Sequence, residues 1–158
     1  MTIDELLAVE SIKRQRLLYS YYLDSGDLHS LVELFTEDAV CEFGPYGVWT
    51  GKDTFYEKFA EAEKPWYANG YFSNLHAVTN HLVELTGAEA ARGRVYLLDF
   101  VVRKLDRDDN PLYWLALYDE EYRKVDDIWK IARCSLYFTW PERHLDDAFF
   151  QKWAPREA

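Results

Sequence analysis

The sequence contains few cysteines and no long run of apolar residues. Its two cysteines, Cys41 and Cys134, fit no metal-binding spacing and no disulfide-rich framework, so we expect buried free thiols. No segment approaches the roughly 20 apolar residues that span a bilayer. The N-terminus also lacks the basic start and apolar core of a signal peptide. These absences indicate a cytoplasmic protein without a membrane partner.

Positive charge is scarce as well. The chain has 18 basic and 28 acidic residues, which gives a formal net charge of −10, and its lysines and arginines form no concentrated stripe. A protein with this balance repels phosphate backbones. We therefore expect no nucleic-acid partner.

Aromatic residues, in contrast, are abundant. The 158 residues include 6 Trp, 12 Tyr and 9 Phe, and 49% of the chain is hydrophobic. This composition is typical of a globular protein, and the length predicts a single domain over residues 1–158. Tyr and Trp combine an apolar body with a polar tip, which suits pockets and interfaces as well as cores.

Helical periodicity precedes residue 64, and long strand-like runs follow residue 74. Gly26 is expected to end the first helix, and Pro65 the third. Helices followed by hairpin-linked strands indicate an α+β fold with an antiparallel sheet. The predicted elements are helices 3–23, 28–35 and 52–63, strands 39–43, 75–86, 90–105, 112–125 and 128–140, a loop 66–73, and a helix 144–153 within the tail 144–158.

One carboxylate, Asp99, lies in the middle of an apolar strand. Leu97 and Val101 share its face, so the carboxylate loses hydration unless it is paired or protonated. A raised pKa would allow Asp99 to act as a general acid. The alternative is a structural ion pair, with Arg94 or Arg133 as the basic partner.

The same strand is apolar on both of its alternating faces between residues 94 and 102. A strand of this kind is covered on both sides of its sheet. Helices can cover one side. We expect a subunit interface to cover the other, in a homo-oligomer.

Three further polar residues occupy the ends of predicted elements. Tyr19 and Asp24 lie at the end of the first helix, and His76 opens the first long strand. Each of them alone is more often structural than functional. Together with Asp99, however, an Asp–His pair in apolar surroundings can move a proton on a small hydrophobic molecule. His81 is five positions from His76 and is expected to face the opposite side of the strand.

The order of several segments resembles the SnoaL-like branch of the nuclear transport factor 2-like superfamily. These segments are LDSGDLHSLVELFTEDAV, a Trp-Thr-Gly turn, NLHAVTNHLVE and RKVDDIWKIARC, and the resemblance covers about residues 5–143. It implies a cone, in which a strongly curved antiparallel sheet wraps a central pocket and N-terminal helices close it.

The resemblance also implies roles for individual residues. Asp24 stands where dehydratases of this branch orient a histidine, His76 at their base, Asp99 at a second carboxylate and Tyr19 at a helix tyrosine. A tyrosine of that site is replaced by Phe43, with Tyr46 nearby as a candidate stand-in. Neither an organic cofactor nor a metal is implied. Residues expected to line the pocket are Tyr22, Phe43, Tyr46, Trp49, Trp66 and Phe72.

The sequence therefore predicts a cofactor-independent dehydratase or isomerase that acts on a small hydrophobic, cyclic substrate. His76 would remove a proton, while Asp99 and Tyr19 would act on an oxygen or a leaving group. Two alternatives remain open. One is the non-catalytic small (beta) subunit of an aromatic-ring-hydroxylating dioxygenase, and the other is a small-molecule-binding protein without turnover.

Overall fold

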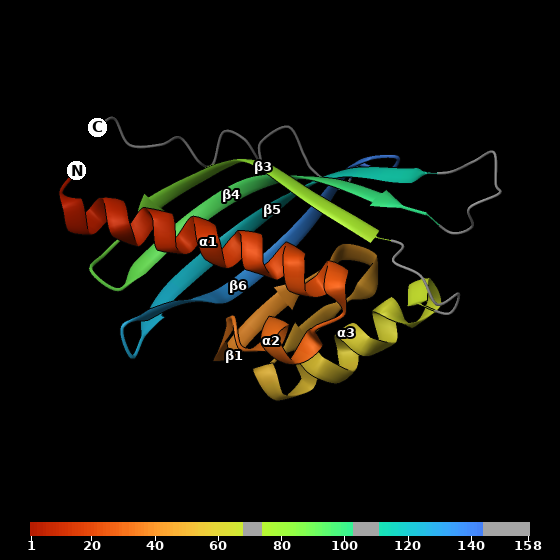
Figure 1. The fold of residues 1–158 in the computed structure, drawn as a ribbon, viewed down its shortest axis with the longest axis horizontal. Helices are drawn as coiled ribbons and strands as arrows, with labels where there is room; N and C mark the ends of the chain where they lie inside the picture. The colour runs from red at the N-terminus through yellow and green to blue at the C-terminus, as the bar shows by residue number, and fades with distance from the viewer. Residues whose placement is uncertain (68–73, 103–110, 144–158) are drawn as a thin grey trace.

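The fold is α+β, and in the part of the chain that the structure describes, three α-helices lie beside a curved, unclosed mixed sheet (Figure 1). The computed structural model describes residues 1–67, 74–102 and 111–143. No helix in these three ranges is both long and apolar enough to cross a membrane. The elements are α1 (Ile3–Ser25), α2 (Leu28–Val32), β1 (Phe35–Glu42), the 3-10 helix η1 (Gly44–Tyr46), β2 (Val48–Thr50), α3 (Lys52–Tyr67), β3 (Asn74–Leu85), β4 (Ala90–Val101), β5 (Leu112–Val125) and β6 (Ile128–Trp140).

Helix α1 has a defined capping structure at each end. Thr2 and Glu5 form a reciprocal capping box at its N-terminus. Gly26 adopts a left-handed conformation, with φ of 73°, at its C-terminus, as the sequence predicts. The buried face of α1 carries Ile12, Arg16, Tyr19, Ser20 and Leu23. Most of the apolar residues whose spacing predicts this helix lie outside its buried face and are exposed to solvent.

Several predicted boundaries differ from those observed. Helix α2 ends at Val32, because Phe35 already pairs with Ile131 of β6. Helix α3 continues past Pro65, which was expected to end it. A proline removes one backbone donor, and here only the last residues of the helix follow it. Segments 68–73, 103–110 and 144–158, with the predicted tail helix, lie outside the described residues.

The sheet has the strand order β2-β1-β6-β5-β4-β3. Strands β3 to β6 form antiparallel neighbours, as predicted, but β1 pairs with β6 in parallel. The prediction of an entirely antiparallel sheet is therefore wrong at this pair. Parallel neighbours need a long crossover, and here α3 and several strands lie between β1 and β6 in the chain, so no local turn indicates the pairing.

Strand β3 contains an irregularity that reverses the side-chain alternation. The register against β4 shifts between Thr79 and Leu82, and Asn80 has a positive φ of 54°. One extra residue on β3 places His81 on the same face as His76. The expectation that the two histidines face opposite sides is therefore wrong. A bulge of this kind has no reliable sequence signature.

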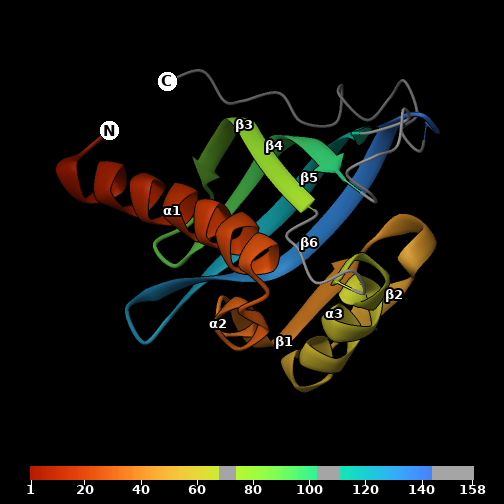
Figure 2. The ribbon, with the colours of Figure 1, turned by 45° about the vertical axis from the view of Figure 1, so that its right-hand side comes forward.

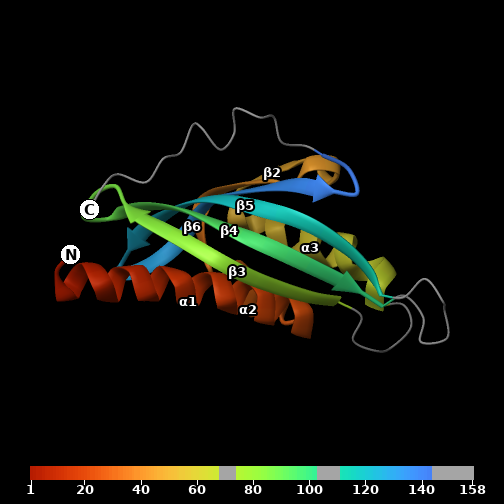
Figure 3. The same ribbon diagram turned by 90° about the horizontal axis from the view of Figure 1, so that it is seen from above.

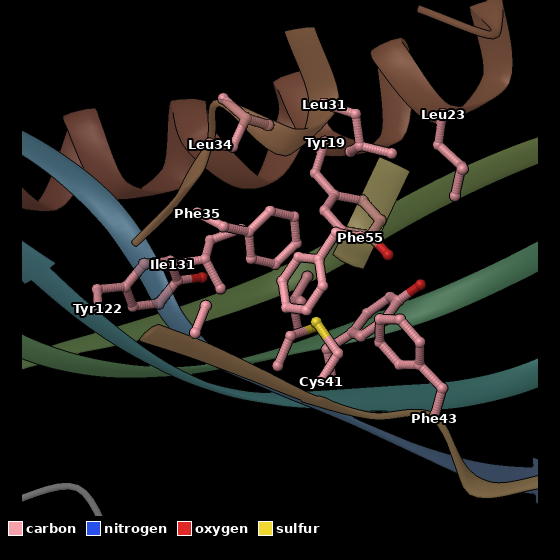
Figure 4. Close-up of a cluster of buried hydrophobic side chains, with 14 of the residues drawn as sticks. Tyr19, Leu23, Leu31, Leu34, Phe35, Cys41, Phe43, Phe55, Tyr122 and Ile131 are labelled. Atoms are coloured by element: carbon pink, nitrogen blue, oxygen red, sulfur yellow. The ribbon is translucent and has the colours of Figure 1, made fainter. Parts of the chain in front are cut away.

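The hydrophobic core fills the space between the helices and the facing side of the sheet. Seen from two further directions, the strands curve, with α1 along one face and α3 beside β1 and β2 (Figures 2 and 3). Tyr19 projects from α1 toward the sheet, and its ring packs edge-on against Phe35, which in turn packs against Phe55 (Figure 4). Cys41 and Cys134 are buried free thiols, as predicted. This core supports the inner surface on which the candidate site is built.

Candidate active site

Asp24 and His76 form a close pair between the end of α1 and the start of β3. The Asp24 carboxylate accepts the backbone N–H of His76 at 3.0 Å and lies 2.5 Å from its Nδ1. Both side chains are largely buried, at 13% and 9% exposure. With Nδ1 donating to Asp24, Nε2 keeps its lone pair and can accept a proton. The contact between Asp24 and His76 that the family resemblance implies is therefore present.

Asp99 lies opposite His76 on the neighbouring strand. The two residues are directly paired in the β3–β4 register, and Asp99 Oδ1 is 4.0 Å from His76 Nε2. This oxygen is buried and has no hydrogen-bond partner among the described residues. Burial, partly opposed by His76 and reinforced by Asp24, raises the pKa of the Asp99 carboxyl. The Nε2 atom of His76 thus faces a carboxyl group whose pKa is raised.

The alternative explanation of Asp99 as half of an ion pair is not realised with either arginine. Arg94 instead contacts Asp119 at 3.1 Å, and Arg133 contacts Glu42. The flanking residues Leu97 and Val101 are buried on the face that Asp99 shares, as their spacing predicts.

A cavity of about 100 Å³, partly open to solvent, lies next to this pair. It occupies the space between the inner face of the sheet, α1 and α3. Phe43, Trp49 and Phe59 form one wall through edge-to-face and tilted ring contacts. The sequence-predicted residues that line the cavity are Tyr19, Phe43, Tyr46, Trp49, His76 and Asp99.

Three residues expected in the lining are not placed there. Tyr22 is half-buried against the core and is absent from the cavity lining. Trp66 falls within α3, but its side chain is not described, and Phe72 lies outside the described residues. Asp24 does not line the cavity either, but it contacts His76, which does.

The lining also contains residues that sequence reasoning missed. Tyr118 and Trp114 face the cavity from β5, Phe138 from β6 and Asn74 from the start of β3. The even positions of β5 share one face, which is a signal in the sequence. Only the register, in which Trp114 opposes Asp99, decides which of these residues lie beside Asp99.

Comparison with protein families supports the fold. The SnoaL-like domain family matches residues 4–135, which is most of the chain. The chain belongs to this family. No curated protein matches this SnoaL-like chain.

Solved structures similar to this SnoaL-like domain share its fold. A proposed scytalone dehydratase from Novosphingobium aromaticivorans is 24% identical, with a TM-score of 0.73 over 92% of this chain and 94% of that one. The hexachlorocyclohexane dehydrochlorinase LinA type 3 from Novosphingobium barchaimii is 19% identical, with a TM-score of 0.72 over 91% and 98%. An NTF2-like protein with a cystatin-like fold, also from N. aromaticivorans, is 17% identical, with a TM-score of 0.76 over 89% and 87%.

The side chains around the cavity can also be compared with the donor groups that a metal ion needs. Within residues 1–67, 74–102 and 111–143, no group of three His, Cys, Asp or Glu side chains is placed to hold a metal ion. The contacts of His76 and Asp99 instead suit the transfer of protons.

Proposed function

We propose that this protein is a cofactor-independent lyase or isomerase that removes a proton from carbon in a small cyclic substrate. The observation that supports this most directly is the series of contacts from Asp24 to His76 to Asp99, in which His76 and Asp99 line a cavity. Such an arrangement supplies a base and an acid to the same bound molecule.

His76 is the proposed base. Its Nε2 takes a proton from a carbon beside a carbonyl or a leaving group, and the electron pair of the broken C–H bond forms a C=C bond. Asp24 stabilises the imidazolium that results, through the 2.5 Å contact to Nδ1. A base placed in this way contributes about 10²- to 10⁴-fold to the rate.

Asp99 is the proposed acid. Its burial favours the protonated carboxyl, which can donate to a leaving hydroxyl as the C–O bond breaks, so that water departs. In an isomerisation the same proton would go to a carbonyl oxygen. Tyr19, whose ring lines the cavity, donates a hydrogen bond to that oxygen.

The cavity indicates the size of the substrate. A cavity of about 150 Å³ in another protein binds benzene, and this one measures about 100 Å³ beside its opening. Its walls are mainly aromatic and aliphatic. A single six-membered ring with one or two oxygen substituents, partly emerging through the opening, is the substrate class we propose.

The relatives are consistent with this chemistry. One is described as a proposed scytalone dehydratase and another as a hexachlorocyclohexane dehydrochlorinase, so both names denote eliminations. The identities, at 24% and 19%, transfer only the fold. The proposal therefore depends on the residues of this chain.

The test uses 3-hydroxycyclohexanone in D₂O, followed by proton NMR. Deuterium uptake beside the carbonyl reports proton removal, and the appearance of cyclohexenone reports elimination. We expect the wild-type protein to accelerate one or both, and His76→Ala to slow them by about 10²-fold or more. His29→Ala is the matched control, because His29 is exposed on α2 and stacks on Tyr56, away from the cavity.

Full activity of His76→Ala would show that the proposed base is wrong. Absence of both reactions in the wild-type protein, across a series of ring ketones, favours the alternatives without catalysis. A dioxygenase subunit would then co-purify with a large iron–sulfur partner, whereas a binding protein would retain a ring compound unchanged.

A further inference from the structure

Arg16 is a fully buried arginine in the middle of α1. Its guanidinium forms an ion pair with Glu120 of β5 at 2.8 Å, and both side chains are 0% exposed. Its Nε and second terminal nitrogen have no hydrogen-bond partner among the described residues. A buried ion pair with unsatisfied donors is a weak source of stability, because lost hydration offsets most of the attraction. Stability alone therefore does not account for Arg16.

The guanidinium lies over two tyrosine rings at once. Its central carbon is 3.8 Å from the ring centroid of Tyr19 and 3.8 Å from that of Tyr118. The two rings meet edge-on, with centroids 6.0 Å apart and an interplanar angle of 63°. Contacts this close between a cation and two ring faces fix the position of both rings.

Both of these tyrosines line the cavity that holds His76 and Asp99. Among the described residues, no hydrogen bond engages either tyrosine hydroxyl, although both side chains are buried. The hydroxyls are therefore available to a bound molecule. A buried tyrosine hydroxyl usually has a partner, and a substrate oxygen is a suitable one here.

The groups that face Arg16 from the other elements hold it in place. Glu120 also accepts a hydrogen bond from Tyr122, whose hydroxyl lies 3.3 Å from His81 Nε2. Burial lowers the pKa of His81 to about 4, so at neutral pH His81 adds no charge. Cys134 lies 3.9 Å from the guanidinium and stays a thiol, because burial raises its pKa. The cation beside the two tyrosines is thus fixed from the sheet side.

We propose that Arg16 is a positioning residue, which holds Tyr19 and Tyr118 so that both hydroxyls donate to one substrate oxygen opposite His76. This inference rests on the proposed function and adds Tyr118 and Arg16 to it. The two hydroxyls stabilise negative charge that develops on that oxygen as His76 removes the proton. The guanidinium strengthens both donors, because its positive charge opposes the rise in tyrosine pKa that burial causes.

The test measures binding of an oxyanion probe and needs no turnover. The probe is 4-fluorophenol, whose ¹⁹F NMR shift reports whether its oxygen is ionised. We expect the wild-type protein to lower the pKa of the bound probe relative to the free probe. Tyr118→Phe removes one hydroxyl and should weaken binding of the ionised probe about tenfold or more.

The double variant Arg16→Met with Glu120→Gln removes the cation without leaving a buried carboxylate unpaired. It should raise the pKa of the bound probe by about one unit, equivalent to about tenfold weaker binding of the ionised form. The single variant Glu120→Gln keeps the Arg16 cation, so it should leave the pKa of the bound probe unchanged or lower it. Arg123→Gln, which removes an exposed ion pair with Asp38, is the matched control.

An unchanged probe pKa in a folded double variant overturns the inference, as does a wild-type protein that does not favour the ionised probe. If the double variant does not fold, Tyr118→Phe serves as the test. An unchanged affinity of this variant for the ionised probe overturns the inference. The two proposals fail separately. A fully active His76→Ala refutes the proposed base and leaves the probe result intact, whereas an inactive His76→Ala with an unaffected Tyr118→Phe refutes only the tyrosine site.

Discussion

At the scale of single residues, the candidate site depends on which nitrogen of His76 carries a proton. Asp24 accepts from Nδ1 and from the backbone N–H of the same histidine, so one carboxylate fixes both the ring orientation and the tautomer. The pairing of Asp24 with His76 follows from the family resemblance. The unpaired oxygen of Asp99 follows from its apolar strand neighbours.

The substitution Asp24→Asn tests the tautomer argument. The amide oxygen of the new side chain can still accept the backbone N–H of His76, but no negative charge remains to stabilise an imidazolium. An amide N–H that faces Nδ1 also favours the wrong tautomer. We expect the rate of deuterium exchange into 3-hydroxycyclohexanone to fall by about 10²- to 10⁴-fold. Circular dichroism should show an unchanged fold. A loss smaller than about threefold contradicts the proposed role of Asp24.

The substitution Asp99→Asn should separate stability from activity. Because the pKa of Asp99 is raised, the folded protein holds this proton more tightly than the unfolded chain does. Asp99 therefore opposes folding increasingly as pH rises above its ordinary pKa of about 3.9. Asparagine does not titrate, so the unfolding free energy of Asp99→Asn relative to wild type should increase from pH about 4 to pH about 8. Elimination by the variant should slow by about 10²-fold.

Urea unfolding of both proteins at the two pH values measures the first effect. An equal difference in unfolding free energy at both would show that Asp99 is ionised with an ordinary pKa. Normal elimination by the variant would remove Asp99 from the mechanism.

At the scale of secondary-structure elements, the β3 bulge decides which side chains reach the inner face. It brings His81 beside Gly93 of β4 and Tyr122 of β5. A Cβ on Gly93 would lie 2.9 Å from His81 Nε2 and 3.2 Å from the Leu82 carbonyl oxygen. The missing side chain at this position therefore makes room for the bulge and its histidine.

Gly93→Ala should consequently destabilise the protein. Overpacking against the backbone and a buried ring costs about 1–3 kcal/mol, measured as the free energy of unfolding in urea. Gly87→Ala is the control, because its Cβ would meet only the Ala90 side chain, at an ordinary 3.9 Å. Equal stability of the two variants would mean that β3 adapts without strain.

At the scale of the whole molecule, the outer side of the sheet presents an apolar surface. Tyr113 and Trp140 stack there with centroids 4.8 Å apart and are 48% and 45% exposed. Leu98 and Leu115, which oppose each other across β4 and β5, are also exposed. The homo-oligomer expected from the two-sided apolar strand remains a prediction, and this surface is where we expect the interface.

The double variant Leu98→Glu with Leu115→Glu tests that prediction. Charged side chains in an apolar interface lose hydration without gaining partners, so association should weaken. Sedimentation equilibrium should give a dimer or trimer mass for the wild-type protein and a monomer mass for the variant. A monomeric wild-type protein would contradict the prediction.

Features that depend on near neighbours in the chain could be predicted from the amino-acid sequence. Alternation and helical spacing located the four long strands to within a few residues, and Gly26 marked the end of α1. The same alternation indicated that Asp99 lies on a buried face. These properties are local, because the periods of helix and strand are set by backbone geometry within a few residues.

How these elements face one another could be seen only in the folded protein. There, β1 pairs with β6 in parallel, the alternation of β3 reverses at the bulge, and Arg16 is buried between two tyrosines. An arginine is usually a surface residue, and the burial of Arg16 depends on its ion pair with Glu120, which is 104 positions away in the chain. Register and burial depend on partners that are distant in the chain, and no local pattern in one sequence records which of them will meet.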